Sequence, residues 1–137
     1  MKALMLVTCL AGLAVASQEP SYTEEDFWYL SHVIQAESGY CSAEMMEGVG
    51  SVVLNRVADE RFPDSIREVI QQPGQYSTLA WLESQVPTDE VMEVTTDLLE
   101  NGSKFPENVI FQANFPQGSG IYQTLSTSYS TMYFCYG

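Results

Sequence analysis

The sequence has few positive charges. Five Lys and Arg residues stand against 18 Asp and Glu residues, which gives a net charge of -13. A surface this acidic repels the phosphate backbone, so we do not expect the chain to bind nucleic acid. It also repels other anionic polymers, which favours a contact region for a neutral glycan or peptide within an otherwise repulsive surface.

Histidine and cysteine are also scarce. His32 is the one histidine, and Cys9 lies in the apolar N-terminal run, which leaves Cys41 and Cys135. Two cysteines and one histidine are too few for a convincing zinc site, so the sequence predicts neither a metal nor an organic cofactor. An even pair of cysteines in an exported chain is first interpreted as a disulfide, and two buried free thiols are the alternative.

The N-terminus has the pattern of an export signal. Lys2 precedes an apolar run that ends at Ala14-Val15-Ala16, the small-x-small form that a signal peptidase accepts before Ser17. The run is shorter than the about 20 residues that a transmembrane helix needs. We therefore predict a signal peptide at residues 1–16, a secreted or wall-associated protein, and no stable membrane insertion after cleavage. An uncleaved membrane tether is the alternative.

The remaining chain of about 120 residues is enough for one domain with one core. We interpret residues 17–22 as a linker and residues 23–137 as the domain. Helix starts are predicted at Thr23, Ser42, Ser65 and Thr88, each a capping residue before an apolar periodic stretch. Three short β-branched or aromatic segments then predict strands: Val109–Ala113, Ile121–Leu125 and Met132–Tyr136. The predicted fold class is α+β, with helices first and a small antiparallel sheet after them.

Glu37 is the first residue whose position suggests chemistry. It follows the apolar face of the first predicted helix and lies in that helix's last turn. A glutamate that is partly removed from water has a raised pKa, and it can then hold the proton that a general acid gives to a glycosidic oxygen. From its position alone, a solvated glutamate at a helix end is the favoured interpretation.

Three stretches carry a resemblance to a known family. They are Leu30–Glu37 (LSHVIQAE), Glu47–Val57 (EGVGSVVLNRV) and Arg61–Tyr76 (RFPDSIREVIQQPGQY). The sequence resembles the cell wall hydrolase family that includes the spore-cortex enzymes SleB and CwlJ. That family has a catalytic glutamate on its opening helix, a VVLNRV helix, and an RFP-x-(S/T)-I segment that ends in GQ(F/Y).

The resemblance implies a small lysozyme-like or transglycosylase-like catalytic domain over residues 23–137. Its activity would be cleavage of peptidoglycan or spore-cortex glycan between N-acetylmuramic acid and N-acetylglucosamine, with Glu37 as the acid. No second carboxylate stands in a recognisable motif, which favours a lytic transglycosylase with one glutamate. The alternatives are an N-acetylmuramoyl-L-alanine amidase, which usually needs a metal cluster, and a wall-binding protein without activity.

The resemblance also implies substrate-binding residues. Gln75 and Tyr76 match the family's glutamine-aromatic pair, and we expect Gln75 to bind an acetamido group while Tyr76 stacks on a sugar ring. A turn residue and a core aromatic are the alternative interpretation of this pair. Phe111 and Tyr133 are the further candidates for substrate binding: Phe111-Gln112 stands in place of the family's aromatic-rich strand, and Tyr133 is the remaining aromatic wall from the last strand. The sequence also departs from the family at Ser130-Thr131-Met132, where family members often have Gly-Asn-His.

The two remaining cysteines could hold the walls of the expected cleft in place. A Cys41–Cys135 disulfide would fasten the loop after Glu37 to the terminal strand. We interpret Asn55 and Arg56, which also match the family, as structural hydrogen-bonding residues.

Overall fold

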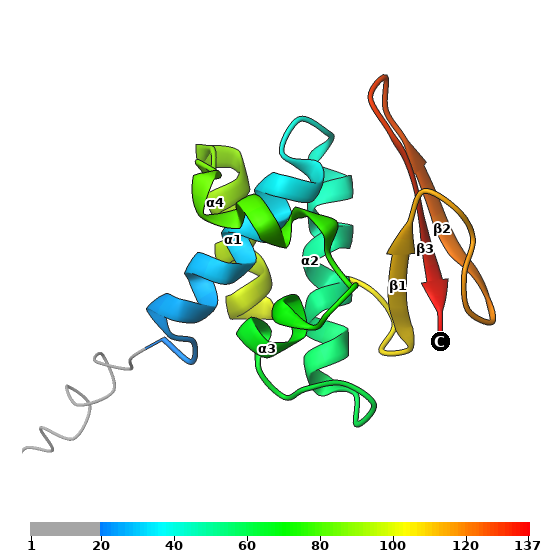
Figure 1. The fold of residues 1–137 in the computed structure, drawn as a ribbon, viewed down its shortest axis with the longest axis horizontal. Helices are drawn as coiled ribbons and strands as arrows, with labels where there is room; N and C mark the ends of the chain where they lie inside the picture. The colour runs from blue at the N-terminus through cyan, green and yellow to red at the C-terminus, as the bar shows by residue number, and fades with distance from the viewer. Residues whose placement is uncertain (1–19) are drawn as a thin grey trace, which may run out of the picture.

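Helices come first and strands last in the computed structural model, which describes residues 20–137 (Figure 1). The elements are α1 Glu24–Ser38, α2 Ala43–Ala58, α3 Ile66–Gln71, the 3-10 helix η2 Ser77–Ser84, α4 Asp89–Asn101, β1 Val109–Ala113, β2 Gly120–Ser126 and β3 Thr131–Tyr136. This order confirms the predicted α+β class. The predicted signal peptide at residues 1–16 lies outside the described residues.

The predicted helix starts are confirmed by their caps. The Thr23 hydroxyl accepts a hydrogen bond from the Asp26 backbone N–H at 3.0 Å, and the Asp26 carboxylate accepts one from the Thr23 N–H at 3.0 Å. The hydroxyls of Ser42, Ser65 and Thr88 cap α2, α3 and α4 in the same way, each accepting a backbone N–H three residues on. These bonds satisfy N–H groups that have no partner inside the helix. No sequence pattern predicted η2.

Helix α2 lies at the centre of the molecule, between the other helices and the sheet (Figure 1). The apolar faces of α1 and α2 meet there, and their core side chains are fully buried. Two glycines of α2 allow close packing: a methyl group at Gly48 would collide with the Phe134 ring, and one at Gly50 would collide with Leu98 of α4. Glycine has no Cβ, so these two positions leave room for side chains of β3 and α4 against α2.

The strands form one antiparallel sheet in the order β1-β3-β2, so the C-terminal strand β3 is the central one. Met132 and Phe134 of β3 are buried in the helix-facing core. Because successive side chains of a strand point to opposite faces, Tyr133 and Cys135 face away from the helices. None of the helices in residues 20–137 is long and apolar enough to cross a membrane.

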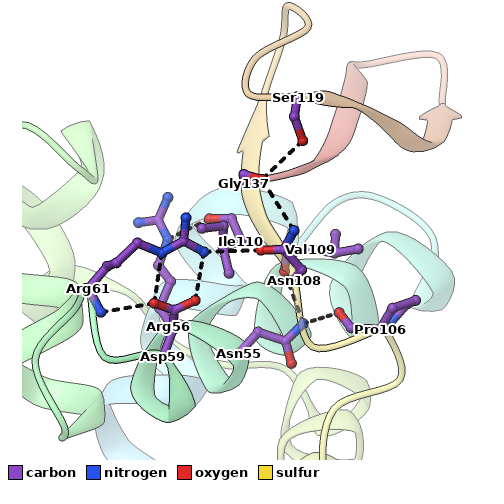
Figure 2. A network of polar contacts seen from close by, with 10 residues as sticks. All are labelled: Asn55, Arg56, Asp59, Arg61, Pro106, Asn108, Val109, Ile110, Ser119 and Gly137. Carbon is purple, nitrogen blue, oxygen red and sulfur yellow. Dashed lines mark hydrogen bonds and ion pairs between the residues drawn. The ribbon is translucent and has the colours of Figure 1, made fainter.

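Polar side chains of α2 fix the sheet to the helices (Figure 2). Asn55 donates its amide hydrogens to the carbonyl oxygens of Pro106 and Val109 at 2.8 and 2.9 Å. Arg56 donates through Nε to the Ile110 carbonyl at 2.7 Å. Both side chains are nearly fully buried, at 6% and 4% exposure, so these bonds fix β1 at one place on α2. The structural interpretation of this pair is confirmed.

Candidate active site

Glu37 is the penultimate residue of α1, and the end of that helix is firmly held. The Ser38 hydroxyl donates to the Ile34 carbonyl at 2.9 Å, and the Gly39 N–H donates to the Gln35 carbonyl at 2.9 Å. The buried Gln35 side chain in turn accepts the Thr88 N–H at 3.0 Å, which connects α1 to the start of α4. The Glu37 carboxyl group therefore extends from a rigid part of the backbone.

The Glu37 side chain is partly buried, and this burial raises its pKa above the usual 4.5. Removing a carboxylate from water disfavours the charged form, so the acid keeps its proton to a higher pH than a surface glutamate does. A carboxyl group that is protonated at working pH and still reaches solvent can act as a general acid.

Glu37 opens into a hollow of about 470 Å³ between the helices and the sheet, which we call the polar hollow. Its other lining residues carry amide, hydroxyl or small side chains, with one phenylalanine and one methionine: Gly74, Gln75, Ser77, Gln112, Ala113, Asn114, Phe115, Gln117, Ser130, Thr131 and Met132. In the part of the chain that the structure describes, Glu37 is the single charged side chain of this lining. The polar hollow is thus suited to a neutral, hydrogen-bonding ligand.

Gln75 lies where the sequence prediction requires it, and Tyr76 does not. The Gln75 side chain is exposed in the polar hollow, and its Oε1 accepts a hydrogen bond from Arg56 Nη1 at 3.0 Å. Tyr76 is only 5% exposed and packs in the core, so its ring cannot stack on a sugar. The predicted stacking role of Tyr76 is therefore wrong.

Tyr76 nevertheless lies close enough to Glu37 for their charges to interact. Burial raises the pKa of the Tyr76 hydroxyl to about 12; Arg56 opposes this rise, and Glu37 adds to it. The hydroxyl is buried without a hydrogen-bond partner in the structure. Tyr76 is therefore a buried core residue near Glu37 rather than a sugar platform.

Neither of the other predicted aromatic residues lines the polar hollow. Tyr133 is on the face of β3 opposite to Met132, which does line it. Phe111 pairs with Cys135 across the sheet, and its ring centre lies 5.9 Å from the Arg56 guanidinium carbon. Both rings lie outside the polar hollow, Tyr133 by strand alternation and Phe111 by the register shift before it, so this hollow supports a sugar-binding role for neither.

The predicted Cys41–Cys135 disulfide is also wrong, because both thiols are free. Cys41 lies beside the β2–β3 turn, where the Thr127 hydroxyl is 3.9 Å from its Sγ. Cys135 is buried near the other end of β3, where its Sγ accepts the Gln117 N–H at 3.5 Å. The two sulfur atoms thus contact different loops.

The sequence prediction missed Gln112. This residue of β1 lines the polar hollow, and its Oε1 is buried without a hydrogen-bond partner. A buried amide oxygen without a donor is costly to keep, which makes it a good acceptor for an N–H group of a ligand. A glutamine between Phe111 and Ala113 in an otherwise apolar strand was the signal that could have found it.

The sequence also matches a known protein family. The sequence model of the family described as Cell Wall Hydrolase matches residues 42–133, which is about two thirds of the chain. This chain belongs to the cell wall hydrolase family. The match begins after Glu37, so the family assignment does not depend on that residue.

Solved structures support the same fold. The chain is similar to the catalytic domain of the germination-specific lytic transglycosylase SleB from Bacillus anthracis, with a TM-score of 0.65 and 18% identity over 86% of this chain and 99% of that one. It is also similar to the catalytic domain of the Bacillus cereus SleB protein, with a TM-score of 0.62 and 17% identity over 85% and 94% of the two chains. No curated protein matches the sequence significantly.

Proposed function

We propose that this cell wall hydrolase cleaves the glycan strands of peptidoglycan as a lytic transglycosylase, with Glu37 as its single catalytic acid and base. The observation that carries the proposal is the partly desolvated Glu37 in a hollow whose other described lining residues carry no charge. The likeness to a SleB catalytic domain described as a lytic transglycosylase supports the same chemistry.

In the proposed reaction, protonated Glu37 gives its proton to the glycosidic oxygen between N-acetylmuramic acid and N-acetylglucosamine. The bond between that oxygen and C1 of the muramyl residue breaks, and positive charge develops at C1. The Glu37 carboxylate then accepts the proton of the muramyl 6-hydroxyl, whose oxygen attacks C1 and closes the anhydro ring. The carboxyl group is restored, and no water is consumed.

The polar hollow would supply the binding contacts. The Gln112 Oε1 lacks a donor, and an acetamido N–H would provide one. The Gln75 Nε2 is free to donate to an acetamido carbonyl, because Arg56 occupies the Oε1 of that amide. In this proposal residues 23–137 form the catalytic domain, and the predicted signal at residues 1–16 would bring it to the wall.

The test compares wild type with Glu37→Gln, which keeps the side-chain shape and removes the acid, and with Glu44→Gln as a matched control. Glu44 is an exposed glutamate of α2 that lies outside the polar hollow. Each protein is incubated with peptidoglycan and with spore cortex, and released fragments are identified by mass spectrometry. Anhydromuropeptides from wild type and Glu44→Gln, with none from Glu37→Gln, are the expected result.

Other products would point to other functions. Ordinary reducing ends would mean that water attacks C1, so the enzyme would be a hydrolase. Stem peptides released from intact glycan would favour the amidase alternative, although residues 20–137 bring no three His, Cys, Asp or Glu side chains together as metal ligands. Wall binding without any release would favour a binding protein, and full activity of Glu37→Gln would refute the catalytic role of Glu37.

A further inference from the structure

A second hollow of about 320 Å³ opens on another side of Glu37, and we call it the aromatic hollow. Its lining is Ala36, Glu37, Ser38, Gly39, Tyr40, Cys41, Tyr129 and Ser130. Glu37 and Ser130 line both hollows, so the two hollows meet at these residues. A ligand that fills both hollows would therefore pass across Glu37.

Two tyrosines of the aromatic hollow are unusually exposed. Tyr40 is 82% exposed and Tyr129 is 78% exposed, so neither ring contributes much to the core. They come from distant parts of the sequence, the α1–α2 loop and the β2–β3 turn, yet they line the same hollow. Exposed rings that gather at one hollow are typical of a binding site rather than of fold stability.

The two loops that carry these tyrosines are connected. The Thr127 hydroxyl lies 3.9 Å from Cys41 Sγ and accepts the N–H groups of Tyr129 and Ser130 at 3.2 Å each. The Thr127 N–H also donates to the Ser130 carbonyl at 2.8 Å. These bonds order the backbone of the β2–β3 turn, and the contact with Cys41 brings this turn beside the loop after α1, so the two segments that carry the rings are preformed. A preformed site loses less entropy when it binds.

We propose that Tyr40 and Tyr129 form a sugar-binding subsite in which one or both rings stack on the apolar C–H face of a pyranose. This inference rests on the proposed glycan cleavage at Glu37. The glycan strand would continue from the polar hollow, past Glu37, into the aromatic hollow, so the scissile bond lies between the two. Among residues 20–137, Glu37 is the single Asp, Glu, Lys, Arg or His of this lining. In a chain of net charge -13, such a lining is suited to an uncharged part of the strand.

The test measures binding without turnover. In a Glu37→Gln background, Tyr40→Ala and Tyr129→Ala are each compared with the parent for binding to insoluble peptidoglycan in a sedimentation assay. We expect each change to weaken binding by about 3- to 10-fold, which corresponds to the loss of one ring contact. Tyr40→Phe and Tyr129→Phe keep the ring and should bind within about twofold of the parent, since stacking needs no hydroxyl.

Trp81→Ala provides the matched control, because Trp81 is another exposed aromatic residue, at 53%, and lies outside both hollows. Its loss should leave binding unchanged. In the wild-type background the two alanine variants should raise KM for glycan strands more than they lower kcat, because the acid is retained.

Two results would overturn the subsite: alanine variants that bind like the parent, or a parent that does not bind peptidoglycan. The proposed cleavage is tested separately by the products of wild type. If wild type cleaves, and Tyr40→Ala and Tyr129→Ala also bind and cleave normally, the subsite is refuted. The catalytic role of Glu37 is unaffected by that result. Binding that depends on the rings, with no cleavage by wild type, would support the subsite and refute the enzyme.

Discussion

Arg56→Lys tests whether one buried guanidinium connects the helices, the sheet and the site. Lysine keeps the positive charge but has one nitrogen, which cannot take the place of both Nε toward the Ile110 carbonyl and Nη1 toward Gln75. At least one hydrogen bond from a charged donor is lost, and the ring contacts at 5.0 Å with Phe62 and 5.7 Å with Tyr76 are weakened.

A hydrogen bond from a charged group contributes about 1.5 to 3 kcal/mol, so we expect Arg56→Lys to lower the free energy of unfolding by about 2 kcal/mol. For a domain of this size, each kcal/mol of lost unfolding free energy lowers the melting temperature by about 4 °C, so the melting temperature should fall by about 8 °C. Urea unfolding and thermal unfolding, both followed by circular dichroism, measure the two quantities.

Arg67→Lys is the matched control, because Arg67 is exposed and reaches Glu25 only at 3.5 Å. Its unfolding free energy should change by less than about 0.5 kcal/mol. Equal effects at the two arginines would refute the argument that the buried hydrogen bonds of Arg56 stabilise the fold. Activity gives a second measurement: a displaced Gln75 should raise KM in Arg56→Lys, and no such change should appear in Arg67→Lys.

Three further predictions follow from burial and packing. Gly48→Val should lower the unfolding free energy by about 1 to 3 kcal/mol, because the added methyl groups meet the buried Phe134 ring; unchanged urea unfolding would contradict this. Glu37→Gln should be more stable than wild type above the raised pKa of Glu37 and similar to it well below pH 4.5. The reason is that only wild type must ionise a partly buried acid as pH rises. A stability difference that does not change between pH 4 and pH 8 would argue against desolvation of Glu37. Cys41 should react with iodoacetamide in the folded protein and Cys135 only after denaturation, and a peptide map with a Cys41–Cys135 crosslink would contradict this prediction.

Much of the fold follows from local signals. Caps such as Thr23 and Ser42 act over three residues, so the sequence alone locates the helix starts. The strand segments are recognised by their β-branched and aromatic composition, and β1 begins and ends where the sequence predicts. Helical periodicity places Glu37 after the apolar face that contains Val33 and Ile34, but the family resemblance and not this position singled it out as the acid.

The face of the sheet on which a strand's side chains lie depends on the partner strand and not on local sequence. The register shifts between Val109 and Phe111 against β3, which turns Phe111 to the face of Cys135 and brings Gln112 to the face of Phe134. An extra residue in a strand reverses the alternation after it, so a simple period of two assigns these side chains to the wrong face. This bulge puts Phe111 outside the polar hollow and Gln112 in its lining, whereas Tyr133 lies on the outer face of β3 by ordinary alternation.

The sequence by itself determined the starts of α1 to α4, the strand segments, the acidic surface and the place of Glu37 at the end of α1, since each depends on residues close together in the chain or on composition alone. The tertiary structure decided that β3 is the central strand, that Cys41 and Cys135 stay apart, that Tyr76 points inward, and that Tyr40 and Tyr129 line one hollow. These properties depend on the packing of segments far apart in the sequence, and such packing leaves no periodic signal in either segment.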